Sequence, residues 1–365
     1  MGQLELGKNM KRAFEFLLSL IMGLLPMLAA SAGSNNALDF ATRGYEKQVK
    51  GDLDGAIADY TKAIELRPDY AYAYCGRAGS RGPKGDVDGA IADYAKAIEL
   101  KPDYADAYCG RGFGKQRKGD LEGALADYTR AIELKPGFAD AYCGRGYAKE
   151  LKGDLEGAVA DCTKAIELKP DYVAAYVNRG CAKAAKGDVE GAIGDYTKVI
   201  EASPKYDMAY HARGCLHYDS RNFADALVDF RKAIEVNPAN DYAHFRVWLG
   251  RAKIGEAEPA TTELQRYLAG RANARMDEWT FKIGQFLAGQ LAEAEFLAAA
   301  KSADAKKEAG QLCEAYYYAG SKRLVAGDKA TATDYFQKSI ATDMKPYIEY
   351  ASAVAELKFV KGETK

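Results

Sequence analysis

The chain has 365 residues, with 51 basic and 52 acidic side chains and a formal net charge of -1 at pH 7. No basic tract longer than a few residues is present, so the sequence lacks the electrostatic signature of a nucleic-acid-binding protein. The HExxH, P-loop and GxSxG patterns of common enzyme sites are also absent, as is a GxGxxG that follows a strand pattern.

The N-terminus has the pattern of an export signal. Basic residues lie between positions 8 and 12, an apolar run covers residues 16–30, and an Ala-Ser-Ala cleavage motif ends at Ala32. We predict a signal peptide over residues 1–32 and a mature chain that starts near Gly33, in the periplasm or outside the cell. The apolar run is short for a membrane span, and an uncleaved N-terminal anchor is the alternative.

Two further expectations concern this segment. Residues 1–9 add nothing that a signal needs, so we expect translation to start at Met10, with Met1 as the alternative. A bacterial lipoprotein needs a cysteine at its cleavage point, and no cysteine follows the apolar run before Cys75. We therefore expect no lipid anchor.

A period of 34 residues dominates the chain from residue 37 onward. Prolines recur at this spacing, and Gly-Asp pairs and alanines keep the same interval. The prolines are Pro68, Pro102, Pro136, Pro170, Pro204 and Pro238. A fixed period of this length indicates one structural unit copied along the chain, in which each copy buries its apolar face against its neighbours.

Residues 105–138 show what one copy should form. Apolar residues at helical spacing predict a first helix that ends at Gly119, because glycine fits a left-handed cap. Asp120 should cap a second helix, and Pro136 should stop it. Each copy is therefore predicted to be a helical hairpin, and the whole chain an all-α solenoid.

These copies resemble the tetratricopeptide repeat (TPR) family. The family pattern has an aromatic residue at unit position 4, Gly or Ala at 8, Ala at 20, an aromatic at 24, Ala at 27 and Pro at 32. Position 4 is Phe40, Tyr74, Tyr108, Tyr142, Tyr176 and Tyr210. The resemblance implies a right-handed α-solenoid, with six regular TPR units over 37–240, a degenerate seventh unit over 241–270 and a divergent unit over 313–346.

Two irregularities interrupt the regular units. Gly82 and Pro83 fall in the last turn of a first helix, so we expect this helix to end near Arg81 and to loosen the joint with the next unit. Cys162 stands where other copies have tyrosine. It should be buried, and it should either leave a small void or be compensated by a neighbour.

The C-terminal third departs from the period. Residues 271–312 predict non-repeat helices, and residues 347–360 predict a helix that caps the last repeat. Asp277-Glu278-Trp279 and the run from Leu312 to Tyr318 look like the closing region of the NlpI-type TPR outer-membrane lipoproteins. That resemblance implies an adaptor that brings a periplasmic protease and cell-wall hydrolases together, although this chain lacks the lipidation cysteine.

Opposite charges occupy unit positions 7 and 23 of the regular copies. Position 7 is Arg43, Arg77, Arg111, Arg145, Arg179 and Arg213, and position 23 is Asp59, Asp93, Asp127, Asp161, Asp195 and Asp229. The divergent copies lack both charges together or keep only a partial match. We predict a partly buried, forked Arg–Asp pair in each unit. Solvated charges that were lost together are the alternative.

In TPR proteins the concave surface is lined by positions 2, 5, 9, 12 and 13 of the first helix. This resemblance gives a partner-binding groove made of Tyr72, Cys75, Cys109, Phe113, Cys143, Tyr147, Val177, Cys181, Met208, His211, Cys215 and Tyr218. Aromatic, small and soft side chains suit an extended peptide or helix with apolar anchors. The alternative is that these residues only pack between helices.

Seven cysteines require an account in an exported chain. Those at equivalent positions of neighbouring units should lie too far apart for a disulfide, so we interpret them as small apolar residues repeated by duplication. The alternative function is a thiol- or histidine-dependent redox, metal-binding or hydrolytic activity in the groove. The spacing of His211 and Cys215 on one helix face would serve it.

We therefore predict a non-catalytic scaffold or adaptor with no catalytic residue, metal or cofactor. Its expected partner is a protein or peptide in the concave groove, with a periplasmic protease or cell-wall hydrolase implied by the second resemblance. A link to envelope proteolysis or cell-wall enzyme regulation follows from the same resemblance. Nucleic acid is not an expected partner, and the oligomeric state is left open.

Overall fold

The computed structural model describes residues 36–271, 277–345 and 347–363, and the regular structure within these ranges is entirely helical. The predicted signal peptide and both candidate start residues lie outside them. The chain divides into two compact bodies: the N-terminal body ends at Lys186, and the C-terminal body begins at Gly187. None of the helices in the described ranges is both long enough and apolar enough to cross a membrane.

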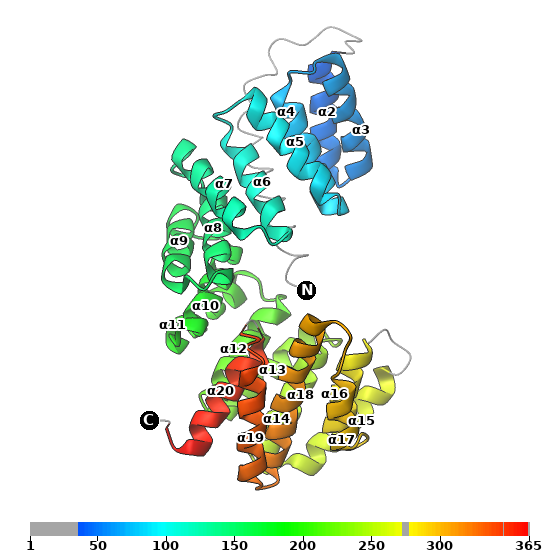
Figure 1. The fold of residues 1–365 in the computed structure, drawn as a ribbon, viewed down its shortest axis with the longest axis vertical. Coiled ribbons are helices and arrows are strands. Elements are labelled where there is room, and N and C mark those ends of the chain that lie inside the picture. The colour runs from blue at the N-terminus through cyan, green and yellow to red at the C-terminus, as the bar shows by residue number, and fades with distance from the viewer. Residues whose placement is uncertain (1–35, 272–276, 346, 364–365) are drawn as a thin grey trace. The chain divides into compact units, whose positions relative to one another are not determined.

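The N-terminal body consists of helix hairpins, each made of a first and a second helix from one 34-residue unit (Figure 1). Its helices are α2 (Ala37–Lys50) with α3 (Leu53–Leu66), α4 (Ala71–Arg81) with α5 (Val87–Leu100), α6 (Ala105–Arg117) with α7 (Leu121–Leu134), α8 (Ala139–Leu151) with α9 (Leu155–Leu168), and α10 (Val173–Lys186). Each hairpin packs on the next one, which is the arrangement of an α-solenoid.

The turn inside each hairpin forms as the sequence predicted. Gly119 follows α6 with a φ of 83°, a left-handed conformation that glycine adopts without steric cost. Asp120 caps α7, because its carboxylate accepts a hydrogen bond from the backbone N–H of Gly123 at 2.9 Å. The same turn recurs at Gly51-Asp52, Gly85-Asp86 and Gly153-Asp154.

The second unit has the predicted irregularity. α4 ends at Arg81, and a short 3-10 turn, Gly82–Lys84, follows because Pro83 has no N–H with which to extend the helix. The expected loosening of the next joint is not borne out, since α5 contacts α6 as extensively as α3 contacts α4.

Small residues let neighbouring units approach closely. Tyr128 of α7 is almost fully buried, and its ring lies against Gly144 of α8 in the next unit. A Cβ atom at Gly144 would lie only 2.6 Å from the ring, so a larger residue would have to displace it. The same approach joins Tyr60 to Gly76 and Tyr94 to Gly110.

Cys162 replaces this tyrosine in α9 and is fully buried. The following unit carries Asn178 in place of the glycine, and Asn178 is also buried, with its Nδ2 donating to Sγ of Cys143 at 3.4 Å. By register, the larger asparagine lies where other units have glycine opposite the tyrosine. Compensation of the smaller cysteine by this neighbour stays a prediction.

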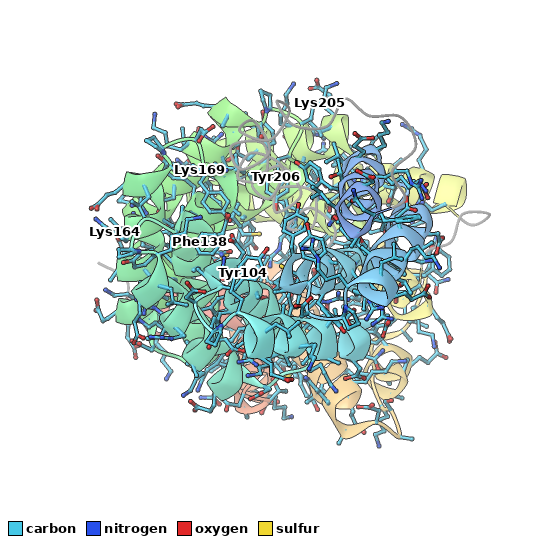
Figure 2. All side chains as sticks on the ribbon, turned by 90° about the horizontal axis from the view of Figure 1, so that it is seen from above. Tyr104, Phe138, Lys164, Lys169, Lys205 and Tyr206 are labelled. Atoms are coloured by element: carbon cyan, nitrogen blue, oxygen red, sulfur yellow. The ribbon has the colours of Figure 1, made fainter. Side chains whose placement is uncertain are left out.

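In three units the lysine that follows the second helix lies over the aromatic ring that precedes the next first helix, and Tyr104 and Phe138 are two of these rings (Figure 2). The ammonium of Lys101 lies 5.0 Å from the ring centre of Tyr104, and that of Lys135 lies 4.4 Å from the ring centre of Phe138. Such cation–π contacts hold the loop between consecutive hairpins against the helix ends.

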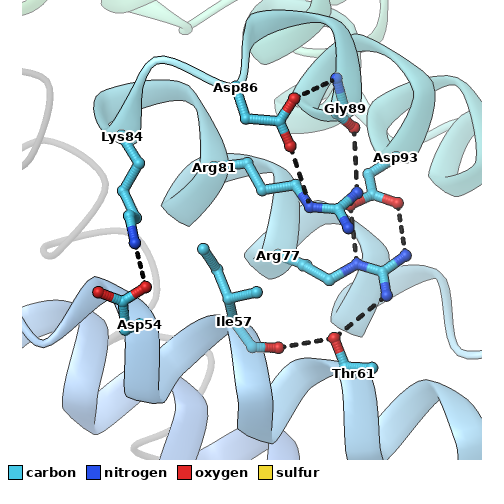
Figure 3. Close-up of polar contacts among 9 residues, drawn as sticks. All are labelled: Asp54, Ile57, Thr61, Arg77, Arg81, Lys84, Asp86, Gly89 and Asp93. Carbon is cyan, nitrogen blue, oxygen red and sulfur yellow. Dashed lines mark hydrogen bonds and ion pairs between the residues drawn. The ribbon is translucent and has the colours of Figure 1, made fainter.

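The predicted Arg–Asp pairs are present within each body (Figure 3). Arg77 of α4 forks onto Asp93 of α5, with Nε and Nη2 donating to the two carboxylate oxygens at 2.8 and 2.7 Å. Arg81 adds a bond to Asp93 at 2.7 Å, and Arg77 also donates to the hydroxyl of Thr61 in the preceding unit at 3.2 Å. The pair therefore links the two helices of one unit and reaches the unit before it.

The same fork recurs with the same geometry in other copies. It joins Arg43 to Asp59, Arg111 to Asp127, Arg145 to Asp161 and Arg213 to Asp229. The carboxylates of these pairs are buried, which confirms ion pairs rather than solvated charges. Arg179 and Asp195 belong to different bodies, so that pair stays a prediction.

The first helices of the N-terminal body form one layer. α2, α4, α6, α8 and α10 each contact the next first helix, whereas the second helices contact first helices and make no comparable contact with one another. The layer whose helices approach more closely is the inner side of a curved solenoid. We call its surface the groove face, defined by unit positions 2, 5, 9, 12 and 13 of these five helices.

The C-terminal body contains the remaining helices (Figure 1). They are α11 (Val189–Ala202), α12 (Asp207–Asp219), α13 (Phe223–Val236), α14 (Asp241–Lys253), α15 (Ala257–Arg271), α16 (Glu278–Leu287), α17 (Glu293–Ala299), α18 (Ala305–Val325), α19 (Lys329–Ala341) and α20 (Ile348–Lys361). One large apolar cluster runs from α12 through α19 and includes residues of α20.

The last hairpin and the final helix give this body a different construction. α18 begins at Ala305, earlier than the expected start at residue 313, because Asp304 caps it by accepting from the N–H of Lys307 at 2.9 Å. α20 packs against α12, α18 and α19. The chain therefore returns to a helix that it left more than 100 residues earlier.

Candidate partner-binding groove

The groove face of the N-terminal body holds eight of the twelve predicted site residues. Tyr72, Phe113, Tyr147, Val177 and Cys181 are half-buried there, with part of each side chain accessible. Cys75, Cys109 and Cys143 are buried beneath them. Aromatic rings from three successive first helices are therefore among the partly accessible side chains at these eight positions.

The buried cysteines require a correction. Cys75 is packed out of solvent, and Cys109 and Cys143 form only the floor of a small cavity, so these thiols offer a partner little surface. Burial raises the pKa of the Cys75 and Cys143 thiols to about 12 and that of Cys109 well above its usual value. Because the thiolate is the nucleophile and the metal ligand, these cysteines act as small core residues.

The cavity lies among α6, α8 and α10, with a volume of about 20 Å³. Phe113 and Tyr147 line it together with Tyr172, and Asp140 and Asn178 supply polar groups. This volume accommodates one group the size of a water molecule. The wall is thus mainly aromatic, and a single ionisable carboxyl group opens into it.

Acidic residues on the groove face were missed by the sequence analysis. Asp106 and Asp140 occupy unit position 2 of α6 and α8, and Glu150 occupies position 12 of α8. Burial raises the pKa of both aspartates and raises the pKa of Glu150 to about 7. The same position rule that found Phe113 and Tyr147 would have found these carboxylates.

The groove-face positions of α12 are covered by the chain's own last helix. Tyr218 is 0 % exposed, and its hydroxyl donates to Glu356 of α20 at 3.2 Å. Glu356 also pairs with Arg221 at 2.7 Å and with Lys253 at 2.8 Å. A polar surface of α20 fills the space that a partner would need at this part of α12.

His211, Cys215 and Tyr218 are therefore not an accessible lining, which corrects the prediction for these three. Among the predicted residues of α12, Met208 is the one with substantial exposure, at 40 %. The correction has a physical reason: polar groups of α18 and α20 hydrogen-bond directly to Asp219 of α12 and Arg246 of α14.

The alternative of a thiol–histidine pair also loses its basis. Burial and the nearby Arg246 lower the pKa of His211 to about 3, and burial raises the pKa of Cys215 to about 12. A neutral imidazole beside a protonated thiol does not provide an activated nucleophile. Within the described ranges, no group of three or more His, Cys, Asp or Glu side chains is placed to hold a metal ion.

Three solved structures share the fold. They are a tetratricopeptide repeat protein from Parabacteroides merdae (17 % identity, 70 % of this chain and 100 % of that one, TM-score 0.52), the APC/C hetero-tetramer Cut9–Hcn1 (16 %, 67 % and 46 %, 0.55) and pilF of Pseudomonas aeruginosa (14 %, 60 % and 97 %, 0.52). No curated protein matches the chain. The NlpI-type resemblance gains no support from these comparisons.

Family models cover just over half of the sequence. Models described as TPR repeat or tetratricopeptide repeat match residues 49–79, 84–116, 117–153, 139–172, 173–206 and 208–240. These matches fall on the hairpins described above, with their glycine turns and buried tyrosines. The chain belongs to the tetratricopeptide repeat family.

Proposed function

We propose that this protein is a non-catalytic scaffold that binds a protein or peptide segment on the groove face of its N-terminal body. The observation that carries the proposal is the row of half-buried rings at Tyr72, Phe113 and Tyr147, each from a different first helix. Aromatic side chains are enriched at the centres of protein interfaces, where they bury a large area at a small entropic cost.

Exposed aliphatic side chains extend this surface. Leu38 and Val49 of α2 and Leu151 of α8 occupy groove-face positions and are 38 %, 37 % and 45 % exposed. Large apolar side chains grouped on one face of a folded protein are typical of a binding surface. An extended peptide with apolar anchors would bury them together with the rings.

The C-terminal body is proposed to have a different role. Its corresponding positions on α12 are occupied by α20, so the accessible groove of the scaffold is that of the N-terminal body. We propose that the C-terminal body closes the array of repeats by covering apolar surface that would otherwise face water.

We further propose that the protein acts in the periplasm or outside the cell. The support is the charged stretch, apolar run and cleavage motif within residues 1–32. A periplasmic protease or cell-wall hydrolase as partner is supported only by the similarity of the C-terminal third to NlpI-type proteins. Sequencing the N-terminus of the purified mature protein tests the signal peptide: a start near Gly33 supports cleavage and export, whereas a start at Met1 or Met10 contradicts cleavage.

Photocrosslinking in cells tests the scaffold role. A photoreactive residue at Tyr147 should yield a discrete crosslinked partner that mass spectrometry identifies. The matched control is Lys164, which lies on the exposed side of α9 in the second-helix layer (Figure 2). A partner captured from Tyr147 and not from Lys164 supports binding on the groove face, whereas equal capture or none at Tyr147 contradicts it.

A further inference from the structure

Asp140 has an unsatisfied acceptor at the cavity of the groove face. Its Oδ1 is buried and accepts no hydrogen bond from any residue that the structure describes. The hydroxyl of Tyr172 interacts with the carboxyl group, and burial is the main cause that raises its pKa. A buried carboxylate oxygen without a donor is unfavourable, so a ligand that brings a donor or a positive charge would stabilise it.

The lysines nearest to Asp140 are already engaged elsewhere. The ammonium of Lys169 lies 4.7 Å from the ring centre of Tyr172, and that of Lys135 lies over Phe138. Both lysines lower the pKa of Asp140 through their charge alone, without a hydrogen bond to it. Their positive charges partly offset the negative charge of the carboxylate, but Oδ1 still lacks a hydrogen-bond donor.

The rest of this face carries more acidic than basic groups, because its one basic residue is Arg117, which donates to the carbonyl of Gly82 at 2.8 Å. Burial is the main cause of the raised pKa of Asp106, and the charge of Asp140 raises that pKa further. Glu150 lies three residues after Tyr147 on the same helix, and burial is the only cause that raises its pKa. An acidic ligand would meet repulsion along this face of α8, whereas a basic ligand would be attracted.

The size of the cavity favours a small basic group. A volume of about 20 Å³ has room for a primary ammonium, which is about the size of a water molecule and more compact than the planar guanidinium of arginine. The rings of Phe113 and Tyr147 also line the cavity, and they offer π faces to a cation and apolar surface to an alkyl stem.

We propose that this cavity receives the side-chain ammonium of a lysine from the bound peptide, with Asp140 as its counter-ion. The inference rests on the proposed function, because it assumes that a peptide lies on the groove face. It adds the residue type that the peptide should carry. The flanking residues of the peptide should be apolar, since Phe113 and Tyr147 line the cavity and Leu151 lies one turn after Tyr147 on α8.

A peptide panel tests this inference with the full chain. The probes are N-acetylated, C-amidated peptides of apolar residues around one central position, which is lysine, acetyl-lysine, arginine, glutamate or norleucine. The lysine peptide should bind most tightly. Acetylation of the lysine should raise the Kd by about tenfold or more, because the positive charge is lost. Equal affinity for the lysine and acetyl-lysine peptides would overturn the inference.

Matched variants assign the effect to the carboxylate. Asp140→Asn should remove the preference for lysine, while Asp69→Asn, at an exposed aspartate in the loop after α3, should retain it. Thermal unfolding of both variants checks that each is folded. A preference for lysine that persists in folded Asp140→Asn would overturn the inference.

Two further outcomes separate this inference from the proposed function. Tyr147→Ala should weaken binding of every peptide in the panel, whatever its central residue. If it does so while Asp140→Asn changes nothing, the groove binds peptides but the lysine assignment is wrong. If no peptide depends on Tyr147, the proposed function itself is contradicted.

A further peptide has a free N-terminal amine and no lysine. If it binds as tightly as the lysine peptide, the cavity receives a terminal amine, and the assignment to a lysine side chain is overturned.

Discussion

At the scale of single residues, the buried aspartates show how charge serves structure in this solenoid. Asp127 is buried, and it accepts two bonds from Arg111 at 2.9 and 2.7 Å and pairs with Lys115 at 2.8 Å. The bond to Asp127 is the largest cause of the raised pKa of Arg111. A buried carboxylate is costly alone and acceptable when forked and paired, which explains why arginine accompanies aspartate.

Removing the arginine should therefore be expensive. Arg111→Ala should lower the free energy of unfolding by about 2–3 kcal/mol, because Asp127 keeps only Lys115 as a partner. Lys118→Ala removes an exposed pair with Asp88 and should cost less than about 0.5 kcal/mol. Urea unfolding followed by circular dichroism measures both variants. Equal small losses would show that the fork contributes nothing beyond a surface ion pair.

The thiols provide a second test at this scale. At neutral pH, Cys75 should react with iodoacetamide at least about 100-fold more slowly in the folded protein than in urea, because burial raises its pKa to about 12 and blocks access. Cys181, which is half-buried, should be the first cysteine alkylated. Mass spectrometry of digests taken over time gives the order. Rapid alkylation of Cys75 in the folded chain would contradict its role as a core residue.

At the scale of elements, the helix hairpins follow from local chemistry. Gly119 and Asp120 define a turn through a left-handed backbone and a cap, and both roles are readable from residue type. The position of the rings of Phe113 and Tyr147 also follows from the register of one helix. These features depend on interactions within one unit or with the next one, so a periodic sequence is enough to predict them.

The placement of α20 depends on distant contacts and could not be predicted in this way. Glu349, Ser352 and Glu356 would normally indicate a solvated helix face. All three are buried, because Arg246, Lys253 and Arg221 from distant parts of the sequence form ion pairs or hydrogen bonds with them. The cysteine positions failed for a related reason: the register places them on the groove face, but the neighbouring rings decide that they lie beneath it.

Glu356 should be essential to the docking of α20. Glu356→Ala leaves Arg221 and Lys253 without their buried partner and should destabilise the C-terminal body by about 3 kcal/mol. Glu363→Ala, at an exposed residue beyond α20, is the control. Both tryptophans of the chain, Trp248 and Trp279, lie in this body, so fluorescence during urea unfolding reports it selectively. Identical midpoints for the two variants would rule out this role.

The same carboxylate predicts a dependence on pH. Burial alone would raise the pKa of Glu356, but Lys253 and Arg221 lower it below the usual value of 4.5. A carboxylate with a lowered pKa contributes stability that is fully present above its unfolded value and is lost as the pH falls through its folded value. The stability difference between wild type and Glu356→Ala should therefore shrink below about pH 4.5. A difference that grows on acidification would contradict this assignment.

At the scale of the whole molecule, each of the two bodies is stabilised internally by a different kind of contact. In the N-terminal body each hairpin contacts its neighbours, so stability is close to a sum of local terms. In the C-terminal body Tyr218 and Glu356, which are 138 residues apart, are hydrogen-bonded in the buried interior. Closure of this kind makes the unfolding of one helix depend on many others.

Hydrogen exchange measured by mass spectrometry should reveal this difference. Glu356→Ala should increase exchange not only in α20 but also in the turn between α12 and α13, where Arg221 loses its partner, and in α14, where Lys253 does, and leave α4 to α8 unchanged. Arg111→Ala should increase exchange in α6, α7 and the adjoining α8, with little effect on more distant hairpins, because each unit contacts only its neighbours. If Glu356→Ala affected α20 alone, the last helix would be a peripheral addition. If Arg111→Ala increased exchange evenly from α2 to α10, the N-terminal body would unfold as one block and its repeats would not behave as neighbour-coupled units.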